Sequence, residues 1–260
     1  MKYQILISTI DDNFLKRNYS MGYNHLIINQ LVNKKSSNYI QDNLFTFKEK
    51  GLSKSRNKAI KYSNAVICLI SDDDLEYKDN IDSAITEAFK NNPEADIITF
   101  QIEQPNGVPY KKYNKESFFH NKRTLMRVPS VEIAFRRKSI VDKKLLFDEN
   151  FGLGSIYPTG EETIFLTDAL DAGLIIKYVP LPIVIHSREG LSQDFHNNKY
   201  LIKSKGALFK RIFGKYSFII SFLFSLKKYN LSDVSFFEFL SLIMEGSKEY
   251  KINTGGSHDI

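Results

Sequence analysis

The clearest structural signal in the sequence is residues 65–74, Ala65-Val66-Ile67-Cys68-Leu69-Ile70-Ser71-Asp72-Asp73-Asp74. Six apolar residues lead into a serine and three consecutive carboxylates. A continuous apolar run of this length is typical of a strand that is buried on both faces of a sheet. Ligands of open α/β sheets bind at the carboxyl ends of the strands, so the acids are candidates for a functional site. A divalent cation that bridges carboxylates to phosphate oxygens would offset their mutual repulsion. A solvated turn that caps a helix near Lys78 is the alternative.

The flanking sequence predicts strands that alternate with helices. Strands are expected at 3–9, 25–30, 95–102 and 131–136, and helices at 51–60, 80–91 and 161–171. Residues 38–47 are a weaker strand candidate, and residues 175–185 include strands that Pro180 and Pro182 break. Such alternation indicates βαβ units and an α/β fold with a mixed, mainly parallel sheet flanked by helices.

Composition limits the class of protein. The 260 residues are 42% hydrophobic and 13% aromatic, which is enough for a sizeable core and excludes global disorder. The single cysteine, Cys68, falls inside the predicted buried strand, where it packs as a small apolar residue, and this fits a reducing compartment. No signal peptide and no apolar run of about 20 residues is visible, so we expect a cytoplasmic protein.

Several motifs in order resemble the family 2 glycosyltransferases, which are inverting enzymes of the GT-A fold, here of the kind that serves bacterial glycan biosynthesis. These motifs are Ser8-Thr9 after the first strand, Gly51-Leu52-Ser53-Lys54-Ser55-Arg56-Asn57, the acidic run Ser71-Asp72-Asp73-Asp74, Phe147-Asp148-Glu149-Asn150-Phe151-Gly152, and Gly160-Glu161-Glu162-Thr163-Ile164-Phe165-Leu166. The resemblance covers roughly residues 3–190. It implies a GT-A catalytic domain at 1–195 that transfers a sugar, with UDP-hexose as the expected donor, to a hydroxyl of a saccharide or lipid-linked acceptor in surface polysaccharide synthesis.

The resemblance also assigns the donor site. It implies nucleotide-binding roles for Ser8, Thr9, Asn29, Arg56, Asp72 and Asp73, and ligation of Mn²⁺ or Mg²⁺ by Asp72, Asp73, Asp74 and His186. Two registers of the family's Asp-x-Asp motif stay open. In one, Asp72 and Asp74 form the pair, and in the other Asp73 is the main ligand and Ser71 replaces the first aspartate. The family often has aspartate where Asn29 or Gln30 stands, which weakens the assignment of the donor base.

Inversion needs a carboxylate that takes the proton of the acceptor hydroxyl. By resemblance this base is Glu162, where the family usually has aspartate, with Glu161 as the next choice. The alternative is structural, since acids in a first helical turn are favoured by the helix dipole alone.

The C-terminal segment differs in charge from the rest of the chain. The net charge is +6, yet residues 195–232 hold eight Lys or Arg and no Asp or Glu. We expect a basic, aromatic-rich helical extension at 196–252 and a flexible tail at 253–260. Two interpretations of 196–245 stay open: contact with an anionic membrane surface, which would place the protein peripherally on the inner face of the cell membrane, or packing on the catalytic domain or on another subunit of a homo-oligomer. The aromatics lie among aliphatics, so nucleic-acid binding is not expected.

Two other functions stay open. A catalytically degenerate GT-A domain would act as a glycan-binding or scaffold subunit, as the departures at Asn29, Gln30 and Glu162 suggest. A sugar nucleotidyltransferase would normally carry a Gly-rich phosphate loop near its N-terminus, and residues 8–20 have none.

Overall fold

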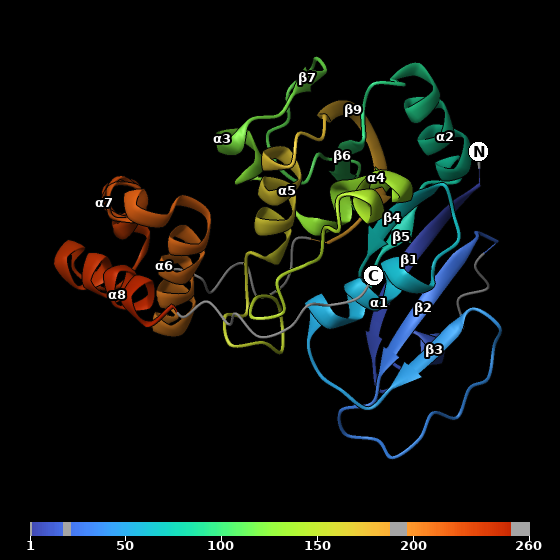
Figure 1. Cartoon of the computed structure of the whole chain (residues 1–260), viewed down its shortest axis with the longest axis horizontal. Coiled ribbons are helices and arrows are strands. Elements are labelled where there is room, and N and C mark those ends of the chain that lie inside the picture. Colours follow the sequence, from blue (N-terminus) through green and yellow to red (C-terminus); the bar gives the residue numbers. More distant parts are fainter. Residues whose placement is uncertain (1, 18–21, 188–196, 251–260) are drawn as a thin grey trace.

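A computed structural model of the chain describes residues 2–17, 22–187 and 197–250 (Figure 1). The strands are β1 (Tyr3–Ile10), β2 (His25–Gln30), β3 (Leu44–Phe47), β4 (Ile67–Ser71), β5 (Glu76–Tyr77), β6 (Ile97–Glu103), β7 (Phe118–Phe119), β8 (Ile133–Arg136) and β9 (Ile176–Ile185). The helices are α1 (Leu52–Tyr62), α2 (Ile81–Asn91), α3 (Lys122–Leu125), α4 (Arg137–Asp142), α5 (Glu161–Asp171), α6 (Lys199–Phe213), α7 (Ser217–Lys228) and α8 (Phe236–Glu249).

The strands form one mixed sheet in the order β3-β2-β1-β4-β8-β6-β9-β5, with β7 paired to β9. Pairing is parallel from β3 through β4 and between β6 and β9. β8 runs antiparallel to both of its neighbours, and β5 and β7 run antiparallel to β9. The predicted α/β class is confirmed, and the sheet is more evenly mixed than expected because these short strands reverse the direction.

The prolines of 175–185 do not break the strand as the sequence suggested. β9 is continuous, and its pairing with β6 shifts register between Thr99↔Tyr178 and Gln101↔Pro182. Proline has no backbone N–H and is therefore tolerated at such an irregularity.

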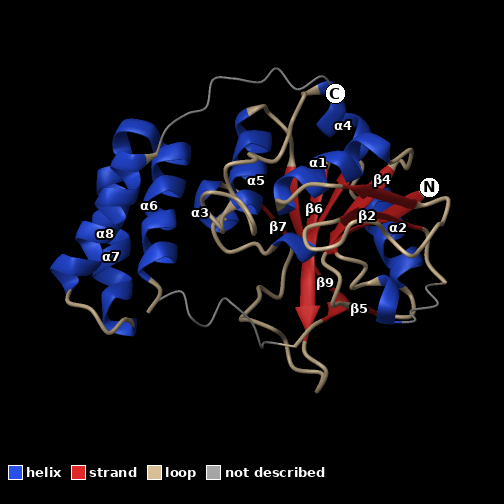
Figure 2. Ribbon diagram, turned by 90° about the horizontal axis from the view of Figure 1, so that it is seen from below, coloured by secondary structure: helices blue, strands red, loops and turns tan. Residues whose placement is uncertain are grey.

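Helices cover both faces of the sheet (Figure 2). On one face, Ile81, Ile85 and Phe89 of α2 join the buried side chains of β1 and β6. On the other, α1, α4 and α5 pack over β1, β4 and β8 in a second core cluster. Burial on both faces explains why β4 is apolar throughout until it ends at the acidic turn.

Helices α6, α7 and α8 lie together at one end of the molecule, with α5 between them and the sheet (Figures 1 and 2). α6 is joined to the sheet-bearing part by Arg211, which pairs with Asp148 and with both carboxylate oxygens of Asp168. Across the described ranges, no helix is long and apolar enough to cross a membrane. The predicted tail at 253–260 and the boundary between residues 195 and 196 lie outside the described residues.

Candidate active site at the carboxyl end of the sheet

The acidic turn follows β4 directly, as the sequence suggested. Asp72 and Asp73 are partly buried and Asp74 is exposed. Thr9, near the end of the neighbouring strand β1, donates a hydrogen bond of 2.5 Å from Oγ1 to Asp73 Oδ2. Because β1 and β4 are parallel, both strand ends reach the same edge of the sheet. Thr9 therefore fixes the position of Asp73.

Arg56 connects this turn to the predicted catalytic pair. α1 places the side chain of Arg56 between two carboxylates: Nη2 lies 3.0 Å from Asp72 Oδ1, and Nη1 lies 2.8 Å from Glu161 Oε1. The guanidinium is 2% exposed and lies 5.5 Å from the centroid of the Phe147 ring. Burial disfavours its charge, but the charges of Asp72, Glu161 and Glu162 outweigh burial and raise the pKa of Arg56. Arg56 is thus ion-paired with two carboxylates of the protein itself.

Glu161 and Glu162 begin α5, directly after Gly160. Gly160 has a φ of 93°, and a Cβ there would lie 2.9 Å from Leu208 of α6. Gly152 has a φ of 99°, and a Cβ there would lie 3.3 Å from the side chain of Glu161. Both positions need glycine for conformation and for space. The Gly-rich loop therefore lets α6 and Glu161 approach the site closely.

The two glutamates have different surroundings. Glu161 is buried and held by Arg56, whereas Glu162 is partly exposed. Burial and the neighbouring charge of Glu161 raise the pKa of Glu162 to about 8, against the opposing charge of Lys205. Burial in turn lowers the pKa of Lys205. Lys205 belongs to α6, and no sequence pattern pointed to it, because the approach of α6 to α5 is a tertiary contact.

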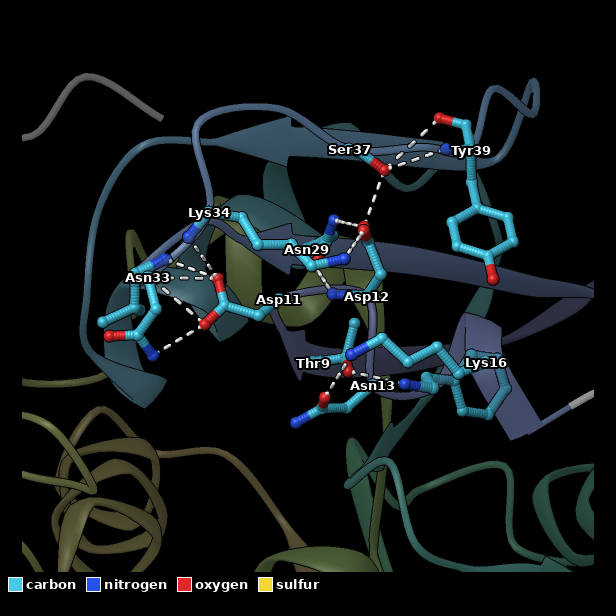
Figure 3. Close-up of polar contacts among 12 residues, drawn as sticks. Thr9, Asp11, Asp12, Asn13, Lys16, Asn29, Asn33, Lys34, Ser37 and Tyr39 are labelled. Atoms are coloured by element: carbon cyan, nitrogen blue, oxygen red, sulfur yellow. Dashed lines mark hydrogen bonds and ion pairs between the residues drawn. The ribbon is translucent and has the colours of Figure 1, made fainter.

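The loop after β1 is held by a second acidic pair, Asp11 and Asp12 (Figure 3). Both have positive φ, 51° and 63°. Asp11 accepts hydrogen bonds from the backbone N–H groups of Val32, Asn33 and Lys34. Asp12 pairs with Lys34 at 2.6 Å. These hydrogen bonds outweigh burial and lower the pKa of both carboxyl groups. The loop is therefore fixed on β2, although neither aspartate was a candidate in the sequence.

Asn29, predicted to contact the base, lies beneath this loop. Its amide is fully buried, donates to Asp12 Oδ1 at 2.7 Å and accepts from the Asp12 backbone N–H at 3.1 Å. In this arrangement Asn29 positions Asp12 and is not exposed to a ligand. Ser8 is also buried and accepts a hydrogen bond from Ser55 at 2.8 Å. Of the six predicted nucleotide residues, Ser8, Thr9, Asn29 and Arg56 are buried supports, while Asp72 and Asp73 are accessible.

His186 directly follows β9, as predicted. Ile185 pairs with Glu76 of β5, two residues after Asp74, so His186 lies at the same end of the β5–β9 pair as the acidic turn. Its ring stacks on Tyr110, with centroids 6.1 Å apart. Within the part of the chain that the structure describes, no three His, Cys, Asp or Glu side chains are arranged to hold a metal ion. The donor set of one or two carboxylates fits Mg²⁺ or Mn²⁺ when ligand phosphates complete the coordination.

Comparison with known proteins shows that part of the chain is similar to one protein family. Residues 27–147 match the sequence pattern of the family described as glycosyl transferase family 2. This part of the chain is therefore similar to a family 2 glycosyltransferase domain. No curated protein sequence matches the chain.

Solved structures of S. aureus TarS share the fold of this chain. TarS 1–349 in complex with UDP-GlcNAc superposes with a TM-score of 0.58 at 13% identity, over 95% of this chain and 91% of that one. TarS 1–349 alone gives 0.54 at 14% identity over the same shares. The GT-A fold expected from the motifs is thereby confirmed. The family match ends at Phe147, so it includes the acidic turn but stops before Glu161 and Glu162.

Proposed function

We propose that this protein is an inverting glycosyltransferase that moves a sugar from a nucleoside diphosphate sugar to a hydroxyl of a saccharide or lipid-linked acceptor. The observation that carries the proposal is the buried Arg56, which bonds Asp72 on one side and Glu161 on the other. It holds an acidic turn suited to a diphosphate and a pair of glutamates suited to proton removal at one edge of the sheet.

Glu162 is the proposed general base. Its raised pKa makes the ionised carboxylate a stronger base than that of an ordinary glutamate, and the ionised fraction grows as the pH rises toward 8. The acceptor oxygen would lose its proton to Glu162 and attack the anomeric carbon from the face opposite the diphosphate. The new glycosidic bond forms as the bond from that carbon to the diphosphate oxygen breaks, and the electron pair leaves with the diphosphate. Glu161 is committed to Arg56 and acts as a positioning residue.

The departing diphosphate needs its charge neutralised. Asp73 and Asp74 are the proposed ligands of Mn²⁺ or Mg²⁺ because Asp72 is engaged with Arg56. Bound there together with phosphate oxygens, the ion would act as a Lewis acid on the leaving group. Thr9, through its hydrogen bond, would hold Asp73 in place for this ion.

UDP-GlcNAc is the first donor to test, because the TarS fold has been captured with UDP-GlcNAc and with UDP. A donor screen that measures released UDP or GDP with Mn²⁺ present tests the function. We expect one UDP-sugar to give release that EDTA abolishes and that Asp73→Asn with Asp74→Asn reduces by at least 100-fold. The thermal unfolding midpoint of that variant should stay close to the wild-type value, since both side chains are accessible.

A control variant in another acidic position makes this screen specific. Asp42→Asn changes an exposed aspartate in a loop on the other side of β2 and should leave release unchanged. If no nucleoside diphosphate sugar is consumed and calorimetry detects no metal-dependent binding of UDP, the protein is a non-catalytic glycan-binding or scaffold subunit instead. Full activity of the double Asp→Asn variant would refute the proposed metal site.

A further inference from the structure

α7 presents five large apolar side chains to solvent, while its serines face the protein together with Ile220 and Phe224. Ser217, Ser221 and Ser225 are 5%, 0% and 0% exposed, and Ser217 Oγ lies 3.4 Å from Ser247 Oγ of α8. Five apolar side chains on the opposite side are 43–56% exposed: Phe218, Ile219, Phe222, Leu223 and Leu226. We call these five residues the α7 face. Ordinary surface helices have the reverse arrangement, with the apolar side facing the core.

The α7 face is one continuous stripe. Its members recur at i, i+1, i+4, i+5 and i+8, which lie on one side of a helix. The stripe continues onto the start of α8 through aromatic contacts: Phe222 meets Phe236 at a centroid distance of 6.0 Å, and Phe236 meets Phe237 at 5.4 Å. Phe237 is itself 80% exposed. Exposed apolar side chains that lie together in this way are suited to contact with an apolar partner.

Positive charge borders both ends of the stripe. Lys215 precedes α7 and Lys227 lies in its last turn, and both are exposed. Lys228 is next to Lys227, and no Asp or Glu occurs from Phe195 to Ser232. An apolar helix face between basic residues is the pattern of helices that lie in the interface of an anionic bilayer, with the apolar side chains reaching the acyl boundary and the lysines meeting lipid headgroups.

The helices behind this face are packed by small residues. A Cβ at Gly206 of α6 would lie 1.8 Å from the carbonyl oxygen of Ile243, and one at Gly246 of α8 would lie 1.9 Å from that of Lys203. The three inward serines of α7, with Ile220 and Phe224 packed against the buried cluster of α6 and α8, complete a close-packed unit of three helices. The five side chains of the α7 face lie outside this packing and are available for a partner outside the protein.

We propose that the α7 face docks the protein onto an anionic lipid bilayer, with α7 lying in the plane of the interface. A second copy of the chain fits this surface less well. A twelve-residue helix is about 18 Å long and ~10 Å wide, so the α7 face, without its continuation on α8, covers roughly 200 Å², whereas a stable dimer buries about 800 Å² on each partner. Two such stripes facing each other would also bring the lysines of both copies together, and their positive charges would repel. Anionic lipid would neutralise these charges instead.

The absence of tryptophan from the sequence provides a sensitive test. Phe222→Trp places a single fluorophore in the α7 face, and Val66→Trp places one at an exposed apolar position next to β4, away from the helical unit. Vesicles of phosphatidylcholine alone and with 30% phosphatidylglycerol are the probes. We expect the emission of Phe222→Trp to shift to the blue only with the anionic vesicles, and that of Val66→Trp to stay unchanged with both.

Vesicle co-sedimentation then separates the apolar and the charge contributions. Phe222→Ser with Leu223→Ser should lower binding to anionic vesicles at least 10-fold, and Lys215→Gln with Lys227→Gln should lower it roughly 5-fold for each lysine removed. The matched controls, Val66→Ser with Ile175→Ser and Lys61→Gln with Lys90→Gln, change exposed residues elsewhere and should bind like the wild type. Circular dichroism confirms that each variant is folded.

The proposal is overturned if the wild-type protein binds neither kind of vesicle, or if the α7-face variant binds as well as the wild type. Light scattering gives a third outcome that would overturn it: a wild-type dimer that Phe222→Ser with Leu223→Ser turns into a monomer, without vesicle binding by either. None of these measurements uses sugar transfer, so the result is independent of the proposed enzymatic activity.

Discussion

Arg56 Nη1 and Glu161 Oε1 lie 2.8 Å apart, although 105 residues separate them along the chain. Each side chain is at most 8% exposed. The pair joins α1 to the first turn of α5 and thereby sets the distance between the acidic turn and Glu162. The first prediction concerns this link.

Removing Arg56 should cost stability as well as activity. Arg56→Met leaves Glu161 buried without its partner, which for a buried ion pair costs about 3–5 kcal/mol of the free energy of unfolding. Urea unfolding followed by circular dichroism measures this. Lys138→Met removes an exposed partner of Asp142 and should change stability by less than ~0.5 kcal/mol. A loss below about 1 kcal/mol for Arg56→Met would contradict a structural role for the pair.

Replacing Glu162 or Glu161 by glutamine should have different effects on activity and stability. Glu162→Gln removes the proposed base and should lower kcat by about 10²- to 10⁴-fold, while the affinity for the donor nucleotide and the stability change little. Glu161→Gln weakens the pair with Arg56 and should lower the unfolding midpoint too. Transfer assays, calorimetry with UDP and thermal unfolding distinguish the two. If Glu162→Gln keeps most of its activity, another group is the base.

Lys205 should tune the pH dependence of the reaction. Its positive charge favours the ionised form of Glu162, so Lys205→Met should raise the pKa of Glu162 above its value of about 8. The acidic limb of the kcat/KM profile should then move to higher pH, and activity at pH 7 should fall further than at pH 9. Lys203→Met, on the same helix but paired with Glu245, is the control and should leave the profile in place. An unchanged limb in Lys205→Met would show that Lys205 does not act through Glu162.

His120 should make folding sensitive to mild acid. Its Nε2 bonds Thr99 and its Nδ1 bonds Thr124, and burial lowers its pKa from 6.5 to about 4. Between these values the unfolded chain binds a proton that the folded protein does not, so stability present above pH 6.5 is lost as the pH falls toward 4. The total is about 3 kcal/mol.

The variant His120→Gln isolates this contribution, because glutamine keeps polar atoms but does not titrate. The free energy of unfolding, measured in urea at pH 7.5, 6 and 4.5, should fall more steeply for the wild type than for His120→Gln. Equal slopes for both proteins would mean that other groups cause the acid sensitivity.

Gly206→Ala should disturb the helical unit specifically. The added methyl would meet the backbone of Ile243, which cannot move without separating α6 from α8. We expect a loss of several kcal/mol in stability, in the range of overpacked sites or larger. Gly173→Ala is a useful comparison: nothing lies within 4 Å of its Cβ, so its cost comes only from its φ of 84°. Hydrogen exchange would show whether Gly206→Ala loosens α6–α8 first.

The α/β class, the position of the acidic turn and the resemblance to the family could be predicted from the sequence, because these depend on local patterns. The apolar run of β4 ends at Asp72 whatever the rest of the chain does, and the start of α5 follows from glycine and two acids in succession. The continuity of β9 through its prolines was not predictable, since the register shift that accommodates them depends on its pairing with β6.

The contacts of the polar side chains came from the tertiary structure alone. Thr9, Asn29 and Arg56 were expected at the ligand, and in the structure they are buried and bond Asp73, Asp12 and Glu161. Packing likewise determines that Lys205 lies near Glu162 and that the α7 face is exposed to solvent. Helical periodicity shows which residues share a side of a helix, but the side that faces solvent depends on which neighbours pack against it.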